Sequence, residues 1–254
     1  MTRRSVDSTL TTLIAAIRSI AAYLAVSLYV LIVGPPGIVL AHMRGGPDVL
    51  YRLGRIGVEM GLWLTGMRYE VDGRHHVQVG RAAVYCVNHT SNVEPPILFL
   101  ALGSLFPRLR ALYKAELHAL PVLSTGFDIA GFVPVARGNR DQSTRAIDTA
   151  AEALRHGNSF LIFPEGTRSR TGELLPFKKG GFVMAIKAQV PIVPVAISGA
   201  RQAMRKGSPV IRPVMIRVWF GSPVETEGMT HADRDRLAMN VRGRIEAMLA
   251  GASE

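Results

Sequence analysis

The chain has 254 residues, and its 30 Lys and Arg outnumber its 19 Asp and Glu, so the formal net charge is +11 at pH 7. It is also apolar, with 48% hydrophobic residues and a mean hydropathy of +0.21. These values exclude a disordered chain, and a single cysteine excludes a disulfide framework or a cysteine-rich zinc site. A basic, apolar, cysteine-poor chain of this length predicts one α/β domain with an appendage, at the cytoplasmic face of an anionic membrane.

The apolar excess is concentrated near the N-terminus, where residues 19–41 form a run of 23 residues without a charge. The run is long enough to span a bilayer and longer than the apolar region of a signal peptide, which makes secretion the less favoured alternative. The sequence Gly-Pro-Pro-Gly interrupts the run at 34–37. Because two prolines remove backbone donors and clash with the preceding turn, the helix is expected to break near Val33.

A second, partly apolar helix is expected at 50–64. Basic residues lie on both sides of the charge-free run, so they do not select an orientation for a single span. Basic flanks on both sides suit a segment that enters the membrane and returns, or that lies in the interface. We therefore predict that residues 1–66 form a pair of membrane-associated helices, and one ordinary spanning helix is the alternative.

After residue 68, short apolar runs alternate with helical patterns, which is typical of an α/β domain with a mainly parallel sheet. This domain is expected to cover residues 67–254. Strands are predicted at 82–87, 131–135, 159–163, 190–197 and 214–220. Helices are predicted at 96–102, 143–156 and 180–188, followed by a last helix that begins at about His231 and is capped by Thr230.

The positive charge is concentrated in residues 161–220, which contain ten Lys and Arg but two Glu. Such a region attracts the phosphates of lipid headgroups, of a nucleotide-like cofactor or of nucleic acid. The alternative is a solvated surface without a specific ligand. The sequence lacks GxSxG, P-loop, GxGxxG and HExxH motifs, and Cys86 lies in an apolar run, where a buried structural thiol is expected.

The strongest candidate for chemistry is the segment 88–96, NHTSNVEPP, which directly follows the predicted strand at 82–87. Functional residues of α/β proteins gather at the carboxyl ends of strands. His89 is a base at neutral pH, and a carboxylate on Glu94 can fix its tautomer while the other ring nitrogen takes a proton from a hydroxyl. The alternatives are a locally satisfied loop histidine and a helix-capping glutamate. Because Pro95 favours the first helical position, Glu94 is expected to be the N-cap.

A second candidate, FPEGTRSR at 163–170, follows the predicted strand at 159–163. Gly166 lets the backbone come close to a ligand, Thr167 can donate a hydrogen bond, and the guanidinium of Arg168 matches phosphate oxygens. The pattern therefore predicts a phosphate-bearing substrate. The alternative is a polar turn with a surface ion pair between Glu165 and Arg168, which would contribute little stability.

These two segments together resemble the 1-acyl-glycerol-3-phosphate acyltransferase family of lysophospholipid acyltransferases. The blocks GFVPVAR at 131–137 and VPIVPV at 190–195 are also similar to the family, as is the element KxEL at 114–117. The blocks follow one another in the family's order over about residues 70–220. This chain departs from the family pattern at Glu94, where the family has aspartate.

The resemblance implies an α/β sandwich with a mixed sheet and an acyl-transfer reaction without an acyl-enzyme. His89 would be the catalytic base that deprotonates the 2-hydroxyl of lysophosphatidic acid, and Glu94 would orient it. The alkoxide would attack an acyl thioester, either acyl-CoA or an acylated acyl carrier protein, to give phosphatidic acid. The resemblance further implies substrate-binding roles for Lys114, Arg137, Glu165, Gly166, Thr167 and Arg168. It implies acyl-donor or structural roles for Pro191 and Pro194.

No metal or bound cofactor is expected. The expected partners are membrane phospholipids, lysophosphatidic acid and the acyl donor, not nucleic acid, with the active site on the cytoplasmic side of the cytoplasmic membrane. Two alternatives remain. One is an acyltransferase of the same fold that uses glycerol 3-phosphate or another lysolipid. The other is a non-enzymatic basic protein that binds membranes or nucleic acid.

Overall fold

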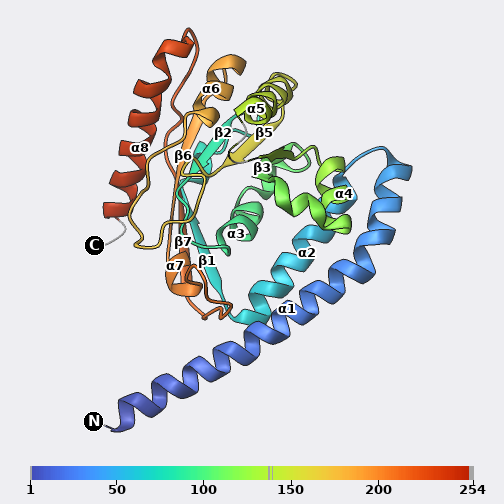
Figure 1. The fold of residues 1–254 in the computed structure, drawn as a ribbon, viewed down its shortest axis with the longest axis vertical. Coiled ribbons are helices and arrows are strands. Elements are labelled where there is room, and N and C mark those ends of the chain that lie inside the picture. The colour runs from blue at the N-terminus through green and yellow to red at the C-terminus, as the bar shows by residue number, and fades with distance from the viewer. Residues whose placement is uncertain (1, 137, 139, 252–254) are drawn as a thin grey trace.

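The structure, a computed structural model, describes residues 2–136, 138 and 140–251. Its strands are β1 (Arg68–Asp72), β2 (Val84–Val87), β3 (Leu109–Lys114), β4 (Val133–Val135), β5 (Ser159–Ile162), β6 (Ile192–Ser198) and β7 (Met215–Phe220). Within these described residues they form a seven-stranded sheet in the order β1-β7-β6-β2-β5-β3-β4 (Figure 1). The pair β6 and β7 is antiparallel, and the other neighbours are parallel. The predicted mixed, mainly parallel sheet flanked by helices is confirmed.

The helices are α1 (Thr2–Arg44), α2 (Asp48–Thr65), α3 (Glu94–Ala101), α4 (Pro121–Ile129), α5 (Arg140–Arg155), α6 (Gly180–Ala188), α7 (Ala200–Ala203) and α8 (Arg234–Gly251). Short 3-10 turns lie at Arg74–His76, Gly103–Leu105, Ala115–Ala119 and His231–Asp233. The last of these begins at a capping box between Thr230 and Asp233, which confirms the predicted cap.

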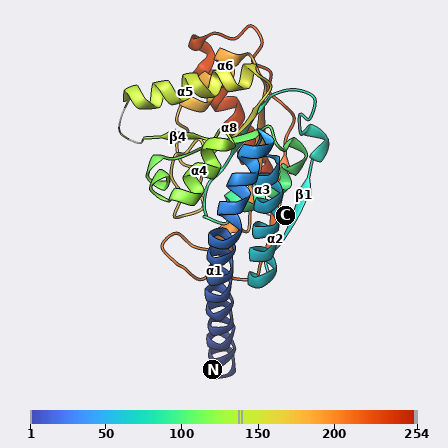
Figure 2. The same ribbon diagram turned by 90° about the vertical axis from the view of Figure 1, so that its right-hand side faces the viewer.

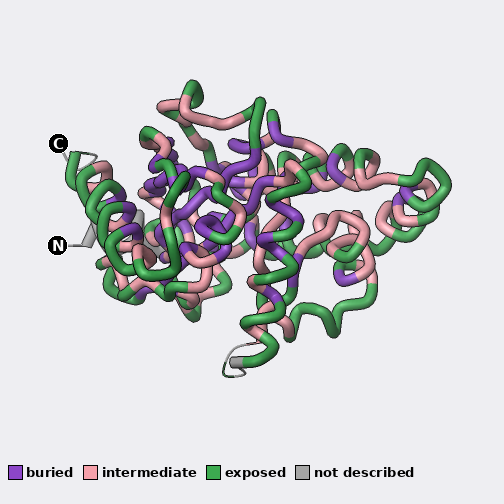
Figure 3. The backbone as a smooth tube through the Cα atoms, turned by 90° about the horizontal axis from the view of Figure 1, so that it is seen from above, coloured by how far each residue is buried: buried purple, intermediate pink, exposed green. Residues whose placement is uncertain are grey.

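Two apolar clusters cover the two faces of the sheet. Along β2, Tyr85 and Val87 pack into a cluster with residues of α2 and α3, whereas Val84 and Cys86 pack with residues of α5, α6 and α8. Side chains alternate in this way because successive residues of a strand point to opposite faces. All four residues of β2 are buried, as expected for a parallel strand that is covered on both sides. Figure 3 shows the buried backbone concentrated in the middle of the molecule.

Among the described strands and α-helices, four have no counterpart among the expected ones: β1, β3, α4 and the four-residue α7. The exposed and half-buried residues of β1 alternate, and β3 has a single buried residue at its start. Both strands carry charged side chains, so neither has the continuous apolar run that marks a buried strand. The nine residues of α4 include one buried residue, Ser124, so its sequence carries little of the pattern of a core helix.

The expected helix break near Val33 is wrong, because α1 continues through Pro35 and Pro36 to Arg44. The reason lies in the packing of this segment. A Cβ on Gly34 would lie 2.6 Å from the side chain of Val122 in α4, and a Cβ on Gly37 would lie 2.5 Å from Leu53 in α2. The glycines let both neighbours come close, and such packing supports a helix that has lost backbone bonds at proline.

The helices α1 and α2 form an antiparallel pair at one side of the sheet domain (Figure 1). The hydroxyl of Tyr29 donates to the carbonyl of Leu53 at 2.9 Å, and Nε of Arg18 donates to the carbonyl of Leu64 at 2.9 Å. The N-terminal end of α1 projects beyond the rest of the molecule (Figure 2). In the part of the chain that the structure describes, the segment Leu10–Arg44 is long and apolar enough to cross a membrane.

Candidate active site

The two candidate segments meet at one edge of the sheet. His89 follows β2, and Glu165 and Arg168 follow β5, the parallel neighbour of β2. Lys114 is the last residue of β3, which is parallel to β5. Because these strands run in the same direction, their carboxyl ends lie at one edge, where α/β proteins place their sites. Arg137 follows β4 in the sequence, and it lies outside the described residues.

The imidazole of His89 binds the carboxylate of Glu94, with 2.6 Å between Nδ1 and Oε2. The Glu94 side chain is 0% exposed and that of His89 is 14% exposed. Since a carboxylate accepts hydrogen bonds, Nδ1 carries the proton and Nε2 is left as the basic nitrogen. Among the described residues, no hydrogen bond occupies Nε2.

The buried Glu94 carboxylate is compensated by further donors. The amides of Thr90 and Ser91 donate to Oε1 at 2.8 and 3.0 Å, and the Thr90 hydroxyl donates to it at 2.6 Å. Glu94 is not the N-cap: Val93 holds that position, and Glu94 is the first residue of α3. From this first helical position, the side chain of Glu94 folds back onto the amides of Thr90 and Ser91, which precede the helix. A buried carboxylate that accepts this many bonds can hold its imidazole partner in one orientation.

Glu165 holds the backbone of His89 in place. Its Oε1 accepts the N–H of His89 at 2.6 Å, and its Oε2 accepts the N–H of Leu175 at 2.9 Å. The carbonyl of His89 in turn accepts the N–H of Ser169 at 2.8 Å. Burial raises the pKa of Glu165 above its ordinary value, and the hydrogen bonds from Leu175 and His89 oppose this shift. The alternative of a surface ion pair with Arg168 is wrong, because both Glu165 oxygens face inward to backbone amides.

The turn after β5 is shaped for an anion. Gly166 has a positive φ of 66°, a conformation that side chains disfavour. The ammonium of Lys206 donates to the carbonyl of Arg168 at 2.9 Å and to the hydroxyl of Thr167 at 3.2 Å. Within the described part of the chain, no carboxylate pairs with the guanidinium of Arg168. An unpaired guanidinium in such a glycine turn can bind a phosphate.

Three further residues were predicted for the site: Lys114, Pro191 and Pro194. Lys114 lies at the carboxyl edge and pairs with Glu116 at 3.1 Å. Pro194 lies inside β6, opposite Cys86. Pro191 precedes β6, and its carbonyl accepts the N–H of Val84 at the start of β2. His89 comes five residues after Val84, so Pro191 lies about 16 Å away along the strand direction. The structure therefore does not bring Pro191 to the site.

Two interactions at His89 and at its neighbour Asn88 are not predicted by the sequence. The ring of Phe163 lies against the imidazole, with 4.2 Å between centroids and 30° between planes. The side chain of Asn88 donates to the carbonyl of Ile197 at 3.0 Å and accepts the N–H of Ile197 at 2.8 Å. Asn88 thereby joins the loop after β2 to the end of β6. Both residues lie inside the two candidate segments, 88–96 and 163–170, but their partners are set by the pairing of strands.

An apolar cavity of about 570 Å³ lies beside the start of α3. Asn92, Val93 and Pro96 line it next to the site. Helices α1, α2 and α4 form its other walls, with Val30, Gly57 and Phe127 among the lining residues. No sequence pattern indicates this cavity, because residues of α1, α2, α3 and α4 form it together. In the described residues, no group of three or more His, Cys, Asp or Glu is arranged to hold a metal.

Comparison with known proteins gives three similarities. Residues 68–198 match the family model described as acyltransferase. The chain is 31% identical over 201 residues to a 1-acyl-sn-glycerol-3-phosphate acyltransferase from Limnanthes douglasii, which covers 76% of this chain and 69% of that protein. It is 32% identical over 182 residues to the alpha form of this enzyme from Homo sapiens, covering 71% of this chain and 63% of the human one.

A solved structure shares the fold. The 1-acyl-sn-glycerophosphate (LPA) acyltransferase PlsC from Thermotoga maritima superposes with a TM-score of 0.79 at 22% identity, covering 93% of this chain and 95% of that one. The matched sequence region contains His89, Glu94 and the turn at 165–168, and the family assignment made from the sequence is confirmed. The chain belongs to the 1-acyl-sn-glycerol-3-phosphate acyltransferase family and is an acyltransferase.

Proposed function

We propose that this acyltransferase transfers a fatty acyl group to the 2-hydroxyl of lysophosphatidic acid, which gives phosphatidic acid. The donor is an acyl thioester, either acyl-CoA or an acylated acyl carrier protein. One observation carries the proposal. The bond of 2.6 Å between Nδ1 of His89 and the buried carboxylate of Glu94 leaves Nε2 as the basic nitrogen, and Asn92 and Val93 of the same segment line the apolar cavity. An acceptor with a phosphate at one end and an acyl chain at the other fits these surroundings.

The reaction needs one base that later becomes an acid. Nε2 of His89 takes the proton of the acceptor hydroxyl as its oxygen attacks the thioester carbonyl. The C–S bond then breaks, and the leaving thiolate takes the proton back from Nε2. The carboxylate of Glu94 stabilises the imidazolium between these steps. Cys86 supplies no nucleophile, because it is fully buried and burial raises the pKa of its thiol.

The phosphate of the acceptor is proposed to bind at the turn after β5. The guanidinium of Arg168 has no acidic partner among the described residues, and Thr167 is exposed there. Glu165 supports the turn from inside by its bonds to His89 and Leu175. We assign this binding to Lys114, Arg137, Gly166, Thr167 and Arg168.

The apolar cavity and the two N-terminal helices are proposed to serve the acyl chains. The cavity is lined by residues of both helices, so a chain can reach it from lipid that surrounds them. Large apolar side chains cover the outer face of α1, where Leu24 is 67% exposed and Leu31 is 63% exposed. We therefore propose that residues 1–66 associate with the membrane and that residues 67–254 form the catalytic domain on its cytoplasmic side.

A thiol-release assay on the full chain tests this function. It combines acyl-CoA of several chain lengths with lysophosphatidic acid, glycerol 3-phosphate and lysolipids that have larger headgroups. Lysophosphatidic acid is expected to give the highest kcat/KM. His89→Ala is expected to lower kcat by roughly 10²–10⁴-fold. His156→Ala, at an exposed position directly after α5, is the matched control and should leave kcat unchanged.

The assay also separates the alternatives. A higher kcat/KM with glycerol 3-phosphate or with another lysolipid would replace the proposed acceptor. The absence of turnover with every glycerophosphate acceptor would overturn the proposal. A non-enzymatic binding protein is no longer an alternative, because the chain belongs to an acyltransferase family.

A further inference from the structure

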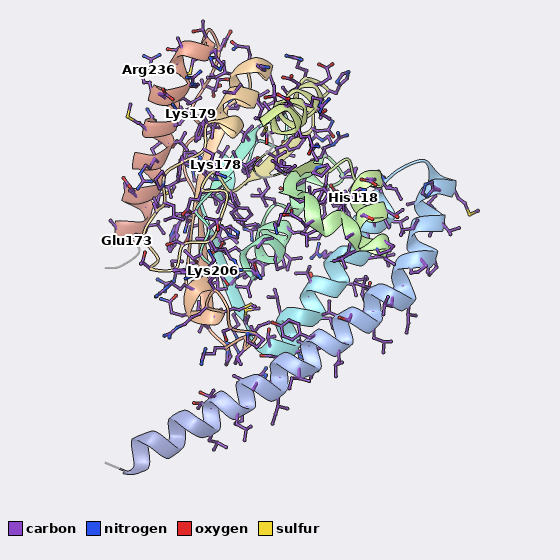
Figure 4. All side chains as sticks on the ribbon, viewed as in Figure 1. His118, Glu173, Lys178, Lys179, Lys206 and Arg236 are labelled. Atoms are coloured by element: carbon purple, nitrogen blue, oxygen red, sulfur yellow. The ribbon has the colours of Figure 1, made fainter. Side chains whose placement is uncertain are left out.

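Two lysines outside the predicted site, Lys178 and Lys206, reach the turn after β5 from different segments. Both are labelled in Figure 4. Lys206 follows α7, and its ammonium donates to Thr167 and to the carbonyl of Arg168. Lys178 precedes α6, and within the described residues its ammonium has no hydrogen bond and no ion pair. Lys206 therefore supports the turn, whereas Lys178 presents an uncompensated charge at it.

The absence of a side chain on Gly166 makes room for Lys178. A Cβ at position 166 would lie 2.7 Å from Cε of Lys178 and 2.9 Å from its Nζ. The positive φ of Gly166 is a second reason why other residues are disfavoured there. The N–H of Lys178 donates to the carbonyl of Pro164 at 2.7 Å, which ties its backbone to the start of the same turn. Backbone and side chain together hold the ammonium over the turn.

The charges around Lys178 leave it without a counter-ion. Glu165, the acid within the turn, directs both oxygens to buried backbone amides. The neighbouring Lys179 is neutralised by Asp235, with 2.8 Å between Nζ and Oδ1. Helix α6 begins directly after these lysines and has no acid in its first turn, so its positive end is not neutralised from within the helix. The unpaired ammonium of Lys178 at Gly166 and the unpaired guanidinium of Arg168, two residues further along the same turn, favour an anion.

We propose that Lys178 binds a phosphate group of a substrate at the Gly166 turn, together with Arg168. This inference rests on the proposed function and adds a specificity-determining residue to it. The phosphate is either the monoester of the lysophosphatidic acid acceptor or a phosphate of the CoA or phosphopantetheine carrier. Both present oxyanions that an ammonium and a guanidinium can hold by charge-assisted hydrogen bonds.

The test compares Lys178→Ala and Lys178→Arg with Lys179→Ala, a matched control one residue away whose charge is already paired. KM is measured for lysophosphatidic acid at saturating acyl-CoA, and for acyl-CoA at saturating lysophosphatidic acid. Lys178→Ala should raise one of these KM values about tenfold, the effect of losing one hydrogen bond between charged groups, with little change in kcat. Lys178→Arg should restore most of the loss, and Lys179→Ala should behave as the wild type.

The KM that rises identifies whether the acceptor or the donor supplies the phosphate. Equal values for Lys178→Ala and Lys179→Ala would overturn the inference. So would a fall in kcat with both KM values unchanged, because that result assigns Lys178 a structural role. If the wild-type chain does not acylate lysophosphatidic acid, the proposed function fails separately. Titration of the wild type and of Lys178→Ala with CoA and with glycerol 3-phosphate then tests the inference without turnover. If, for each of the two probes, the variant has the same Kd as the wild type, the inference is overturned.

Discussion

Nδ1 of His89 and Oε2 of Glu94 lie 2.6 Å apart, although the family to which the chain belongs is expected to have aspartate at position 94. The longer glutamate side chain is accommodated because its first helical position lets it fold back onto residues 90 and 91. A histidine paired with a buried carboxylate is therefore retained here, with glutamate in place of aspartate.

Glu94→Asp is expected to retain or raise activity, since the shorter acid can make the same bond if the loop closes slightly. Glu94→Gln is expected to lower kcat by roughly 10²–10⁴-fold, because an amide neither accepts all four donors nor stabilises the imidazolium. It should also reduce the free energy of unfolding by about 1–3 kcal/mol. Thiol release and urea unfolding measure these effects. Loss of activity in a folded Glu94→Asp variant would contradict the orienting role of Glu94.

Glu165→Gln is expected to loosen the loop that carries His89, because the amide group would face a backbone N–H in place of an acceptor. The expected loss is about 1–3 kcal/mol of stability, with kcat reduced more than KM is raised. His89→Ala provides the comparison: if the two residues act through one loop, the double variant should lose no more kcat than His89→Ala alone.

The pH dependence of unfolding should also reveal Glu165. Burial raises its folded-state pKa above the ordinary value of 4.5. The stability that this group contributes is fully present below its unfolded pKa and is lost as the pH rises through its folded pKa. The wild type should therefore lose stability relative to Glu165→Gln as the pH rises above 4.5. Urea unfolding of both variants from pH 4.5 to 7 measures this difference, and a constant difference would contradict the raised pKa.

Gly166→Ala is expected to destabilise the chain by about 1–2 kcal/mol, because it places a side chain at a φ of 66°. It should also displace Lys178 and raise the same KM that Lys178→Ala raises. In the double variant the two KM effects should not add, since both substitutions remove one interaction. Gly207→Ala, at a φ of 93° with no atom near the added Cβ, controls for backbone strain alone. Additive KM effects would show that Gly166 and Lys178 act separately.

Leu24→Glu combined with Leu31→Glu is expected to weaken membrane association, because it places two charges on the exposed apolar face of α1. Met239→Glu is the matched control, since Met239 is 68% exposed on α8, far from α1 in Figure 1. Co-sedimentation with anionic vesicles measures binding. Unchanged sedimentation of the double variant would contradict a membrane role for α1.

The sequence by itself determined the α/β class, the buried strands of the sheet and the two segments of the site. Continuous apolar runs marked the buried strands β2, β5 and β6, because a strand covered on both faces has no polar side. The histidine segment and the glycine turn were recognisable because they directly follow such strands. Parallel strands place their carboxyl ends at one edge, and the pairing of β2 with β5 in the structure is what puts the two segments side by side there.

Tertiary structure alone decided the contacts between segments distant in sequence. The carboxylate of Glu165 meets His89 because β5 pairs with β2, and Pro191 lies away from the site because it precedes β6 at the opposite edge. Local rules predict that α1 breaks at its prolines, yet close packing at Gly34 and Gly37 sustains it. The cavity and the place of Lys178 likewise depend on which surfaces meet. Such contacts arise from packing across the fold, and no local pattern of residues encodes them.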